Sequence, residues 1–447
     1  MIILIMEIQE KKLKKNIAIL GAGFSGLKCA LDLEKFLRND KDFSSKFNIL
    51  LIDKKNYHLY TPALYEVATT ASRDASGFIL KKIVTTQIEE IIGNKKIKFL
   101  QGEIINIDFE NKTVGFKDTT TINFEYLVLA LGAEPAFFGI DGLKENSLSL
   151  KLLEDGIKIR NRIKNKFLEK NENDNILKVL IGGSGPSGIE FASELVGYIK
   201  ELNKIHCKNI KGDIKLIDGA SHILPGFEHN IVEKASKRVL FLGIEIINGF
   251  VISRVDELKV YLKQLPTSNE PPENFTPQEK IEEYDALIWA GGVQANNILG
   301  SVNVQKEKRG RAEINNFLKC TSPDKHLDIS EKIFAIGDNS CFYDPISQRP
   351  IPGTAKIAIE QAIVAAQNIY NSINKKDKVL YKIKSSPFSI TIGGKYAITK
   401  WGPFLFTGFL GWLLKQLVEL YYLYSITDRV SIFFDWWRGI KIFSKND

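Results

Sequence analysis

The chain has 447 residues, of which 44% are hydrophobic and 26% are charged. This composition excludes an intrinsically disordered chain, and the length predicts two or three folded domains. A formal net charge of +8 is modest for this length and does not by itself indicate a nucleic-acid partner, and the four scattered cysteines predict neither a disulfide framework nor a metal site.

The N-terminal part of the chain has the pattern of a βαβ unit. Asn16–Leu20 is an apolar strand, Leu27–Phe36 has helical spacing, and Phe47–Asp53 is a second strand that ends in an acid. The polar stretch Arg38–Lys46 is interpreted as a surface connection. The turn before the helix has the form G-x-G-x-x-G and consists of Gly21, Ala22, Gly23, Phe24, Ser25 and Gly26.

A turn of this form is typical of dinucleotide-binding sites. The first glycine permits the tight turn, the second lets a pyrophosphate touch the backbone, and the third lets helix and strand pack closely. The free N–H groups of the helix start then hold the phosphates, and Asp53 can accept a hydrogen bond from a ribose hydroxyl. An ordinary glycine-rich turn is the alternative, but the strand, helix and acid around it favour a nucleotide.

The same pattern recurs about 160 residues later. The strand Leu177–Ile181, the helix Ile189–Lys200 and the strand Ile214–Asp218 surround a second turn, made of Gly183, Ser184, Gly185, Pro186, Ser187 and Gly188. An acid at the end of the second strand repels the 2′-phosphate of NADPH, so Asp218 favours NADH. The alternative is that Asp218 only caps a turn.

Two nucleotide turns imply two nucleotides, and FAD in the first with NADH in the second is the economical interpretation. A hydride then passes between the two cofactors, which carry the chemistry themselves. This agrees with the absence of any Ser/His/Asp or Cys/His pattern, and the five histidines are interpreted as structural.

Further strands and a helix follow along the chain. Tyr126–Leu131, Ala286–Ala290 and Ile333–Ile336 are predicted to be buried strands, and Ala355–Tyr370 a helix. Asp338, after the last of these strands, can accept from the ribityl hydroxyls of a flavin; the alternative is a helix cap. Two polar segments, Ile157–Asn175 and Gln264–Glu283, are interpreted as a charged surface helix with a linker and as a loop or irregular hairpin tip.

The C-terminal region is both aromatic and basic. From Tyr381 onward it holds nine Lys and Arg against four Asp and Glu. The apolar segment Trp401–Ile426 carries one narrow stripe of small or polar residues at helical spacing, which comprises Gly408, Gly411, Lys415 and Glu419. This pattern, and the Trp-rich segment Val430–Phe443, predict contact with an anionic membrane surface. Core packing or a dimer interface is the alternative.

These residues together resemble the type II NADH:quinone dehydrogenases, which are flavoproteins of the glutathione-reductase type with two dinucleotide-binding domains. The resemblance covers nearly the whole chain and rests on six segments, namely Ile19–Gly26, Asn56–Ala68, Tyr126–Gly132, Gly183–Glu190, Ile288–Ala295 and Phe334–Asp338.

The resemblance implies an α/β fold with two Rossmann-like domains and a C-terminal amphipathic helical region for membrane association. We expect the FAD-binding domain at residues 1–150 and 310–380, the NADH-binding domain at 151–309, and the membrane-association region at 381–447. The residues expected to bind FAD or NADH are Gly21, Gly23, Phe24, Ser25, Gly26, Asp53, Lys54, Ala130, Gly132, Gly183, Gly185, Pro186, Ser187, Gly188, Asp218, Gly291, Gly292, Gly337, Asp338 and Ala355.

Four residues are expected to take part in catalysis. The family implies that Glu190 lies near the nicotinamide and handles protons, whereas the plain alternative is an acid favoured by the helix dipole. In the helix that lies beside flavin and quinone in the family, two usual glutamines are replaced by Lys356 and Glu360, with Gln361 directly after them. The two replacements form an i,i+4 charge pair in place of two neutral amides, and this change affects which quinone species the site accepts.

The function implied is an NADH:quinone oxidoreductase that pumps no protons and lies peripherally on the cytoplasmic face of the cell membrane. Its partners are NADH, a membrane quinone and the membrane surface, without nucleic acid; a homodimer stays open. A sulfide:quinone oxidoreductase or another pyridine-nucleotide flavoprotein is an alternative. The sulfide enzyme needs paired cysteines at the flavin face, where Cys341 has no evident partner, and a pyridine-nucleotide disulfide reductase needs a close cysteine pair on the early helix, where only Cys29 is present. A non-enzymatic flavin-bearing scaffold or redox sensor is the alternative of another class.

Overall fold

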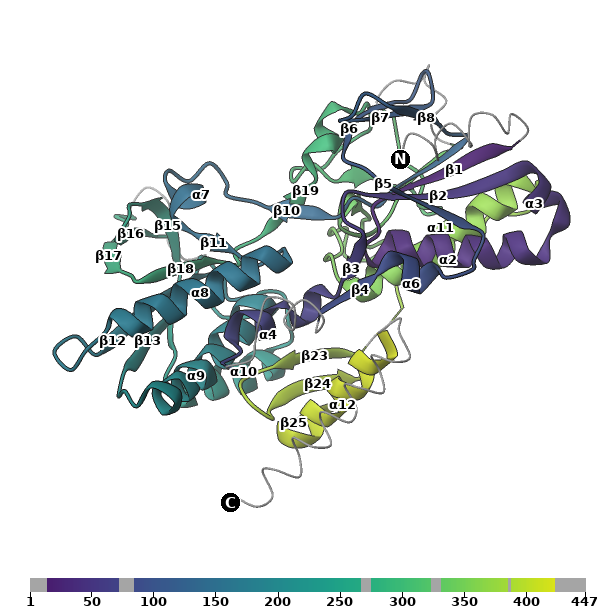
Figure 1. Ribbon diagram of the computed structural model, residues 1–447. Coiled ribbons are helices and arrows are strands. Elements are labelled where there is room, and N and C mark those ends of the chain that lie inside the picture. Colours follow the sequence, from purple (N-terminus) through teal and green to yellow (C-terminus); the bar gives the residue numbers. More distant parts are fainter. Residues whose placement is uncertain (1–13, 72–83, 267–274, 323–330, 385–386, 423–447) are drawn as a thin grey trace. The chain divides into compact units, whose positions relative to one another are not determined.

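The computed structural model describes residues 14–71, 84–266, 275–322, 331–384 and 387–422 (Figure 1). The chain forms two compact units, each assembled from three separate stretches of sequence. The first unit takes its described residues from Met1–Leu59, Thr85–Glu134 and Val293–Lys384, and the second from Tyr60–Val84, Pro135–Gly292 and Ser385–Asp447.

This division differs from the predicted domains at three places. The chain leaves the first unit after Glu134 and re-enters it at Val293, whereas the sequence predicts boundaries near 150 and 310. The C-terminal segment groups with the second unit and does not stand apart from residue 381 onward. The segment Val430–Phe443, predicted to contact a membrane, lies outside the described residues.

The first unit is built on a five-stranded parallel sheet of order β21-β9-β1-β2-β5. Its strands are β1 (Lys15–Leu20), β2 (Phe47–Asp53), β5 (Ile97–Gln101), β9 (Tyr126–Leu129) and β21 (Ile333–Ala335). Parallel strands covered on both faces are apolar throughout, which explains why Ile17 to Leu20 have no exposed surface. The helices α2 (Phe24–Asn39) and α11 (Ala355–Ile373) pack against one another in this unit (Figure 1).

The predicted surface connection Arg38–Lys46 contains a short helix, α3 (Lys41–Lys46), which the sequence pattern did not indicate. The carboxylate of Asp40 accepts from the backbone N–H of Phe43 at 3.0 Å and starts the helix, which buries the Phe43 ring. The remaining elements of this unit are β3 (Tyr57–Leu59), β4 (Thr85–Gln87), α6 (Ile88–Ile92), β6 (Ile104–Asp108), β7 (Thr113–Phe116), β8 (Thr121–Asn123), η3 (Asn297–Ser301), β20 (Ala312–Glu313), η4 (Gly337–Asn339) and β22 (Ser340–Cys341). Two further strands, β10 (Ala133–Pro135) and β19 (Val293–Ala295), stand in the sequence where the chain changes unit.

The second unit repeats the parallel sheet, here in the order β11-β18-β12-β13-β14. Its strands are β11 (Leu148–Ser149), β12 (Ile176–Gly182), β13 (Lys211–Asp218), β14 (Glu245–Asn248) and β18 (Ala286–Trp289). Its helices are η1 (Thr61–Ala63), α4 (Leu64–Thr69), α7 (Leu143–Asn146), α8 (Leu153–Glu169), α9 (Pro186–His206) and α10 (His229–Phe241). The crossover from β12 through α9 to β13 corresponds to that from β1 through α2 to β2, so the predicted internal repeat is confirmed.

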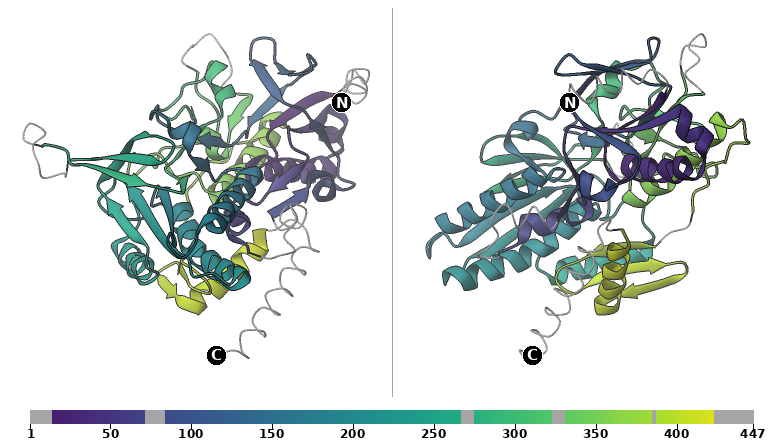
Figure 2. Two further views of the ribbon diagram at one scale, coloured as in Figure 1. Left: turned by 60° about the vertical axis from the view of Figure 1, so that its left-hand side comes forward. Right: turned by 45° about the vertical axis from the view of Figure 1, so that its right-hand side comes forward.

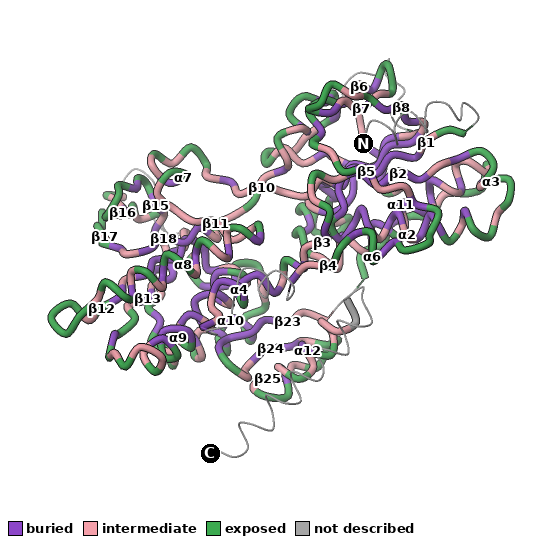
Figure 3. The backbone as a smooth tube through the Cα atoms, viewed as in Figure 1, coloured by how far each residue is buried: buried purple, intermediate pink, exposed green. Residues whose placement is uncertain are grey.

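The charged segment Ile157–Asn175 is helical as predicted, but the helix begins at Leu153 and ends at Glu169. One face is not solvated: Ile159, Ile163 and Phe167 are fully buried at intervals of four residues. Buried and exposed stretches accordingly alternate along the α8 tube (Figure 3). Because Lys and Arg alternate with these apolar residues, the overall polarity of the segment does not indicate that one side of the helix is buried.

Two antiparallel sheets complete the second unit. The first consists of β15 (Phe250–Val255), β16 (Lys259–Gln264) and β17 (Glu279–Glu283). Of the two interpretations of Gln264–Glu283, the antiparallel pairing of β16 with β17 agrees with a hairpin, and the second strand of that hairpin occupies the end of the segment. The second consists of β23 (Phe388–Thr391), β24 (Ala397–Trp401) and β25 (Phe404–Thr407), and the helix α12 (Gly408–Tyr422) contacts all three of its strands (Figure 2). The apolar segment that starts at Trp401 therefore opens with a hairpin before its helix begins.

Candidate functional site

The first glycine turn has the shape that a nucleotide pyrophosphate needs. Gly21 has φ of +104°, and a Cβ atom there would lie 2.2 Å from the carbonyl oxygen of Ala130. A Cβ atom on Gly26 would lie 1.9 Å from the carbonyl oxygen of Gly21. At Gly23, by contrast, no atom of the described residues comes within 4 Å of that position. The outer glycines are therefore required by packing, and the middle one leaves room for a ligand.

The second turn repeats this geometry in the other unit. Gly183 has φ of +110° and would place a Cβ atom 2.6 Å from the carbonyl oxygen of Ala290. Gly188 would place one 2.0 Å from the carbonyl oxygen of Gly183, while Gly185 faces open space to 4 Å among the described residues. Each turn thus fits a dinucleotide phosphate at the start of its helix.

The acids at the ends of β2 and β13 are fixed in the same way. One carboxylate oxygen of Asp53 accepts from the N–H of Ala22 at 2.7 Å, and burial raises the pKa of Asp53. Asp218 accepts from the N–H of Ser184 at 2.7 Å and from the N–H of Ala220 at 2.9 Å. The bond from Ala220 agrees with the alternative in which Asp218 caps a turn. The bond from Ser184 also holds the Asp218 carboxylate beside the second glycine turn.

A second part of the first unit fits the flavin. The N–H of Gly132 donates to the side-chain oxygen of Asn339 at 2.6 Å, and the buried Nδ2 of Asn339 has no hydrogen-bond partner among the described residues. A buried donor without a partner is costly, which suits a position next to a ligand. A Cβ atom on Gly337 would lie 2.7 Å from the Ser25 hydroxyl, so this loop meets the start of α2 and carries Asp338 with it.

Gln361 supports that loop from α11. Its side-chain oxygen accepts from the N–H of Gly337 at 2.7 Å and from the Ser340 hydroxyl at 3.1 Å, and the residue is only 1% exposed. The geometry gives Gln361 a positioning contact, and its predicted catalytic role stays a prediction. Lys356 and Glu360 form the predicted ion pair at 3.2 Å on the same helix.

The predicted cofactor residues divide between the two units. The first unit holds Gly21, Gly23, Phe24, Ser25, Gly26, Asp53, Lys54, Ala130, Gly132, Gly337, Asp338 and Ala355. The second unit holds Gly183, Gly185, Pro186, Ser187, Gly188, Asp218, Gly291 and Gly292, together with Glu190. The predicted residues of the first glycine turn thus lie in one unit and those of the second glycine turn in the other.

Glu190 belongs to a buried group of charges in the second unit. Its carboxylate accepts from the N–H of Thr391 at 3.2 Å and lies 3.5 Å from the Nζ of Lys415. Lys415 also lies 2.9 Å from the Glu419 carboxylate and donates to the Tyr65 hydroxyl at 2.9 Å. Lys415 is 5% exposed, so a cation on the C-terminal helix is buried against the helix that begins at the second glycine turn.

Burial and neighbouring charges act in opposite directions on this group. Burial opposes the charge of Lys415, but Glu419, Tyr65 and Glu190 together hold its pKa well above the usual value. Burial raises the pKa of Glu190, and the charge of Lys415 offsets part of that rise. Glu190 is thereby placed to exchange a proton closer to neutral pH than an ordinary glutamate, which suits a group that handles protons.

The sequence profile of the family described as pyridine nucleotide-disulphide oxidoreductase matches residues 15–362. The type II NADH:quinone oxidoreductase of Staphylococcus haemolyticus is 30% identical over 366 residues, which are 81% of this chain and 83% of that protein. The protein of the same name from Staphylococcus aureus is 28% identical over the same shares of both chains. The chain belongs to the type II NADH:quinone oxidoreductases.

Solved structures agree with this family in fold. The NDH2 of Plasmodium falciparum in complex with NADH has a TM-score of 0.77 at 19% identity, covering 94% of this chain and 97% of that one. The sulfide:quinone oxidoreductase of Aquifex aeolicus has a TM-score of 0.72 at 19% identity, covering 91% and 90%. The two-domain flavoprotein fold predicted from the sequence is therefore confirmed for this type II NADH:quinone oxidoreductase.

Three groups of the site were not identified from the sequence. Asn339 directly follows Asp338, and this second polar residue in the same loop could have been predicted as a further flavin contact. Glu194 lies one helical turn after Glu190 and accepts from the N–H of Gly394 at 3.1 Å. Tyr65 lies in the segment that resembles the family, but no local pattern connects it with Lys415, because 350 residues separate the two.

Glu194 should make the stability of this oxidoreductase depend on pH. Burial raises its pKa from 4.5 to about 7, so the folded state holds this proton more tightly than the unfolded chain does. The resulting stabilisation is complete below pH 4.5 and is lost as the pH rises through 7. We expect the melting temperature of Glu194→Gln to change less between pH 5 and pH 7.5 than that of the unsubstituted protein. Glu201→Gln, at an exposed position on the same helix, is the matched control, and an equal effect of both substitutions would contradict the assignment.

Proposed function

We propose that this protein oxidises NADH and passes the electrons through bound FAD to a membrane quinone. The observation that carries the proposal is the pair of glycine turns, one in each unit, each with an open middle glycine and a fixed acid. FAD, when bound, supplies the two-electron chemistry. The N–H groups at the start of α2 hold its pyrophosphate, and Asp53 and Asp338 accept from its hydroxyl groups.

In the second unit, the start of α9 holds the phosphates of NADH and Asp218 accepts from the ribose. A carboxylate there repels an additional phosphate, so NADH is favoured over NADPH. Glu190, which has a raised pKa and lies next to Lys415, is proposed to exchange the proton that quinone reduction consumes. Lys356 and Glu360 are proposed to set the acceptor preference, because the family resemblance implies that their helix lies beside the quinone.

The test is steady-state oxidation of NADH and of NADPH by the purified FAD-loaded protein, with ubiquinone-like and menaquinone-like acceptors. We expect turnover with NADH and at least one quinone, and a much higher KM for NADPH. Bound FAD without turnover on any quinone would contradict the proposal and favour the scaffold or redox sensor. Acidification of vesicles by the purified protein would contradict a reaction without proton pumping.

The cysteines do not favour the sulfide:quinone alternative. Each of the four, all within the described ranges, is free, and Cys29, Cys320 and Cys341 are buried. Burial raises the pKa of Cys341, so at neutral pH its side chain stays a protonated thiol, which is a weaker nucleophile than a thiolate. Cys341→Ser should leave NADH oxidation at its full rate, whereas loss of quinone reduction in this variant would support a thiol-dependent reaction.

The membrane contact is proposed to involve α12, an amphipathic helix whose polar side faces the protein and whose apolar side faces outward. Its residues Gly411, Lys415 and Gln416 are buried, while its exposed residues are all apolar, namely Phe409, Leu410, Leu413 and Leu417. Trp401 and Phe404, in the hairpin before it, are 52% and 66% exposed. Exposed apolar side chains that gather on one side of a helix are typical of an interfacial membrane contact. Within the described residues, every helix is too short or too polar to cross a bilayer.

The double substitution Leu410→Gln and Leu417→Gln should weaken vesicle binding. Both side chains are 52% exposed, and burying a leucine contributes roughly 1.5–3 kcal/mol, so we expect the partition constant to fall by about tenfold or more. Co-sedimentation with phosphatidylglycerol-containing vesicles measures it, and NADH oxidation by a water-soluble acceptor should be unchanged. Leu240→Gln on α10, at a position that is 58% exposed, is the matched control. Equal loss in both proteins would contradict a specific role of α12.

A further inference from the structure

A cavity of about 290 Å³ lies in the second unit between α8 and α9, outside the parts assigned to either cofactor. Arg160 and Lys164 reach its wall from α8, and His206 from the end of α9. Leu202 and Ile205 form an apolar part of the same wall. No acid belongs to this described lining, so the cavity presents cationic groups beside an apolar surface.

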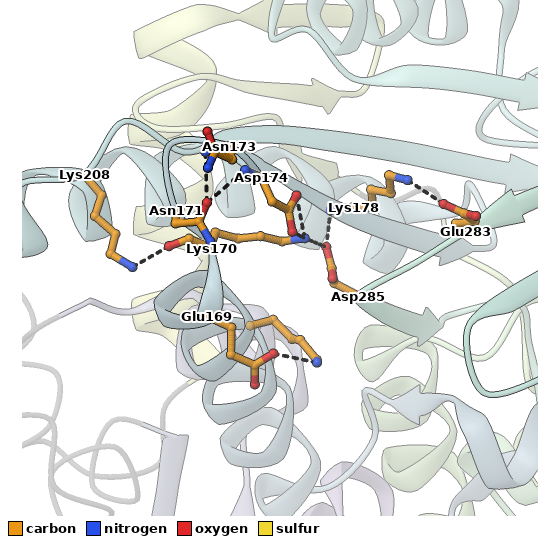
Figure 4. Close-up of polar contacts among 10 residues, drawn as sticks. Glu169, Lys170, Asn171, Asn173, Asp174, Lys178, Lys208, Glu283 and Asp285 are labelled. Carbon is orange, nitrogen blue, oxygen red and sulfur yellow. Dashed lines mark hydrogen bonds and ion pairs between the residues drawn. The ribbon is translucent and has the colours of Figure 1, made fainter.

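Lys208, two residues after the cavity-lining His206, connects α8 with the segment that follows α9. Its Nζ donates to the backbone oxygen of Leu168 at 2.7 Å. It also donates to the backbone oxygen of Lys170 at 2.7 Å (Figure 4). Lys170 in turn lies 3.0 Å from Asp174 and 3.1 Å from Asp285 (Figure 4). These contacts connect the end of α8 with the segment that follows α9, and α8 and α9 are the two helices that line the cavity.

The sequence around the cavity has a large cationic excess. Residues 158–170 and 200–211 together contain ten Lys and Arg against two Glu, a surplus of eight that equals the formal net charge of the whole chain. Lys166 and Lys170 are engaged with carboxylates, at 2.7 Å from Glu169 and 3.0 Å from Asp174. Lys164 forms no ion pair with any described residue, although it lies on the cavity wall. Such a region attracts anions.

We propose that this cavity binds a small organic anion, a phosphate or carboxylate group carried on a short apolar stem. The anionic group lies between Lys164 and His206, and the stem packs against Leu202 and Ile205. A volume of about 290 Å³ lies just below the range of ligand pockets, which begins at about 300 Å³, so it suits a small ligand and not a second dinucleotide.

The proposed site is separate from the NADH turn. Leu202 follows Gly185 by 17 residues along one continuous helix, which corresponds to about 25 Å. The anion and NADH therefore bind at opposite ends of α9 and do not compete. This separation makes the proposal independent of the proposed oxidoreductase function.

The test is calorimetric titration of the full-length FAD-loaded protein with butyl phosphate, butyrate and inorganic phosphate. We expect one saturable site, with butyl phosphate binding at least about tenfold tighter than inorganic phosphate because the stem buries several methylene groups. Lys164→Met should raise the Kd for butyl phosphate by about tenfold or more, since a charge-assisted hydrogen bond is lost. Lys158→Met, at an exposed position on the same helix outside the cavity wall, should leave that Kd unchanged, and both variants should keep the wild-type KM for NADH.

A further arm distinguishes the source of the anion. Competition with butyl phosphate by phosphatidylglycerol vesicles, but not by phosphatidylcholine vesicles, would identify a lipid headgroup, and absence of competition would identify a soluble ligand. The proposal is overturned if neither butyl phosphate nor butyrate binds saturably. It is equally overturned if Lys164→Met and Lys158→Met weaken binding alike, because that result indicates only diffuse attraction to a basic surface.

Discussion

Gly23→Ala should yield a folded protein that has lost its flavin. No described atom lies within 4 Å of a Cβ at this position, and φ of −71° suits any residue, so the polypeptide tolerates the methyl group. The same methyl group occupies the space that a pyrophosphate needs. Each lost charge-assisted hydrogen bond to phosphate costs roughly 1.5–3 kcal/mol, so FAD affinity should fall by about 10-fold to 100-fold for each bond. The ratio of flavin to protein absorbance and the melting temperature measure the two effects separately.

Two further glycine variants serve as controls for this experiment. Gly185→Ala, in the equivalent position of the second unit, should keep the flavin and raise the KM for NADH over the same range. Gly26→Ala should instead lower stability, because its Cβ atom would lie 1.9 Å from a backbone oxygen. A Gly23→Ala protein that retained a full complement of flavin would exclude this turn as the FAD site.

Lys415→Met should cause the largest loss of stability of any single charge substitution considered. The variant leaves Glu190 and Glu419 without their shared cation in a buried region, and breaking a buried pair in this way costs about 3–5 kcal/mol. Urea unfolding at constant pH measures the loss. Lys400→Met removes the cation from an exposed pair with Glu228 and should cost no more than about 1 kcal/mol. Similar losses in the two variants would contradict a structural role for the buried group.

The same substitution should change the pH dependence in a defined direction. Lys415 lowers the pKa of Glu190, so its removal lets that pKa rise further. A carboxyl group with a raised pKa favours the folded state at low pH and opposes it once the pH exceeds that value. The destabilisation by Lys415→Met should therefore be larger at pH 8 than at pH 5. If Glu190 exchanges the proton, the pKa that controls the rate of quinone reduction should rise in parallel.

The two nucleotide turns could be predicted because their signals are local. The glycines, the strand before them and the helix after them lie within one short segment, and both turns formed as expected. The segment after Trp401 was less predictable, since short apolar runs suit strands and helices equally well. The first part became a hairpin and only the residues from Gly408 became helical.

Contacts between distant residues could not be predicted in this way. The stripe of Gly411, Lys415 and Glu419 was recognisable on a helix, but the sequence does not indicate that it is the buried side. That outcome depends on Glu190, 225 residues earlier, which supplies the opposite charge. The changes of unit at Glu134 and Val293 are similarly set by which strands pair, and no composition shift marks them.

The orientation of α12 has a practical consequence for handling the protein. When lipid is removed, the leucines and phenylalanine on its outer side face water, and ionic strength does little to cover them. Preparations without detergent should therefore self-associate through this helix, and the aggregates should dissolve on addition of a mild non-ionic surfactant but not of salt. Particle sizes measured in plain buffer would then report the exposed helix, and the number of subunits should be determined in micelles or nanodiscs.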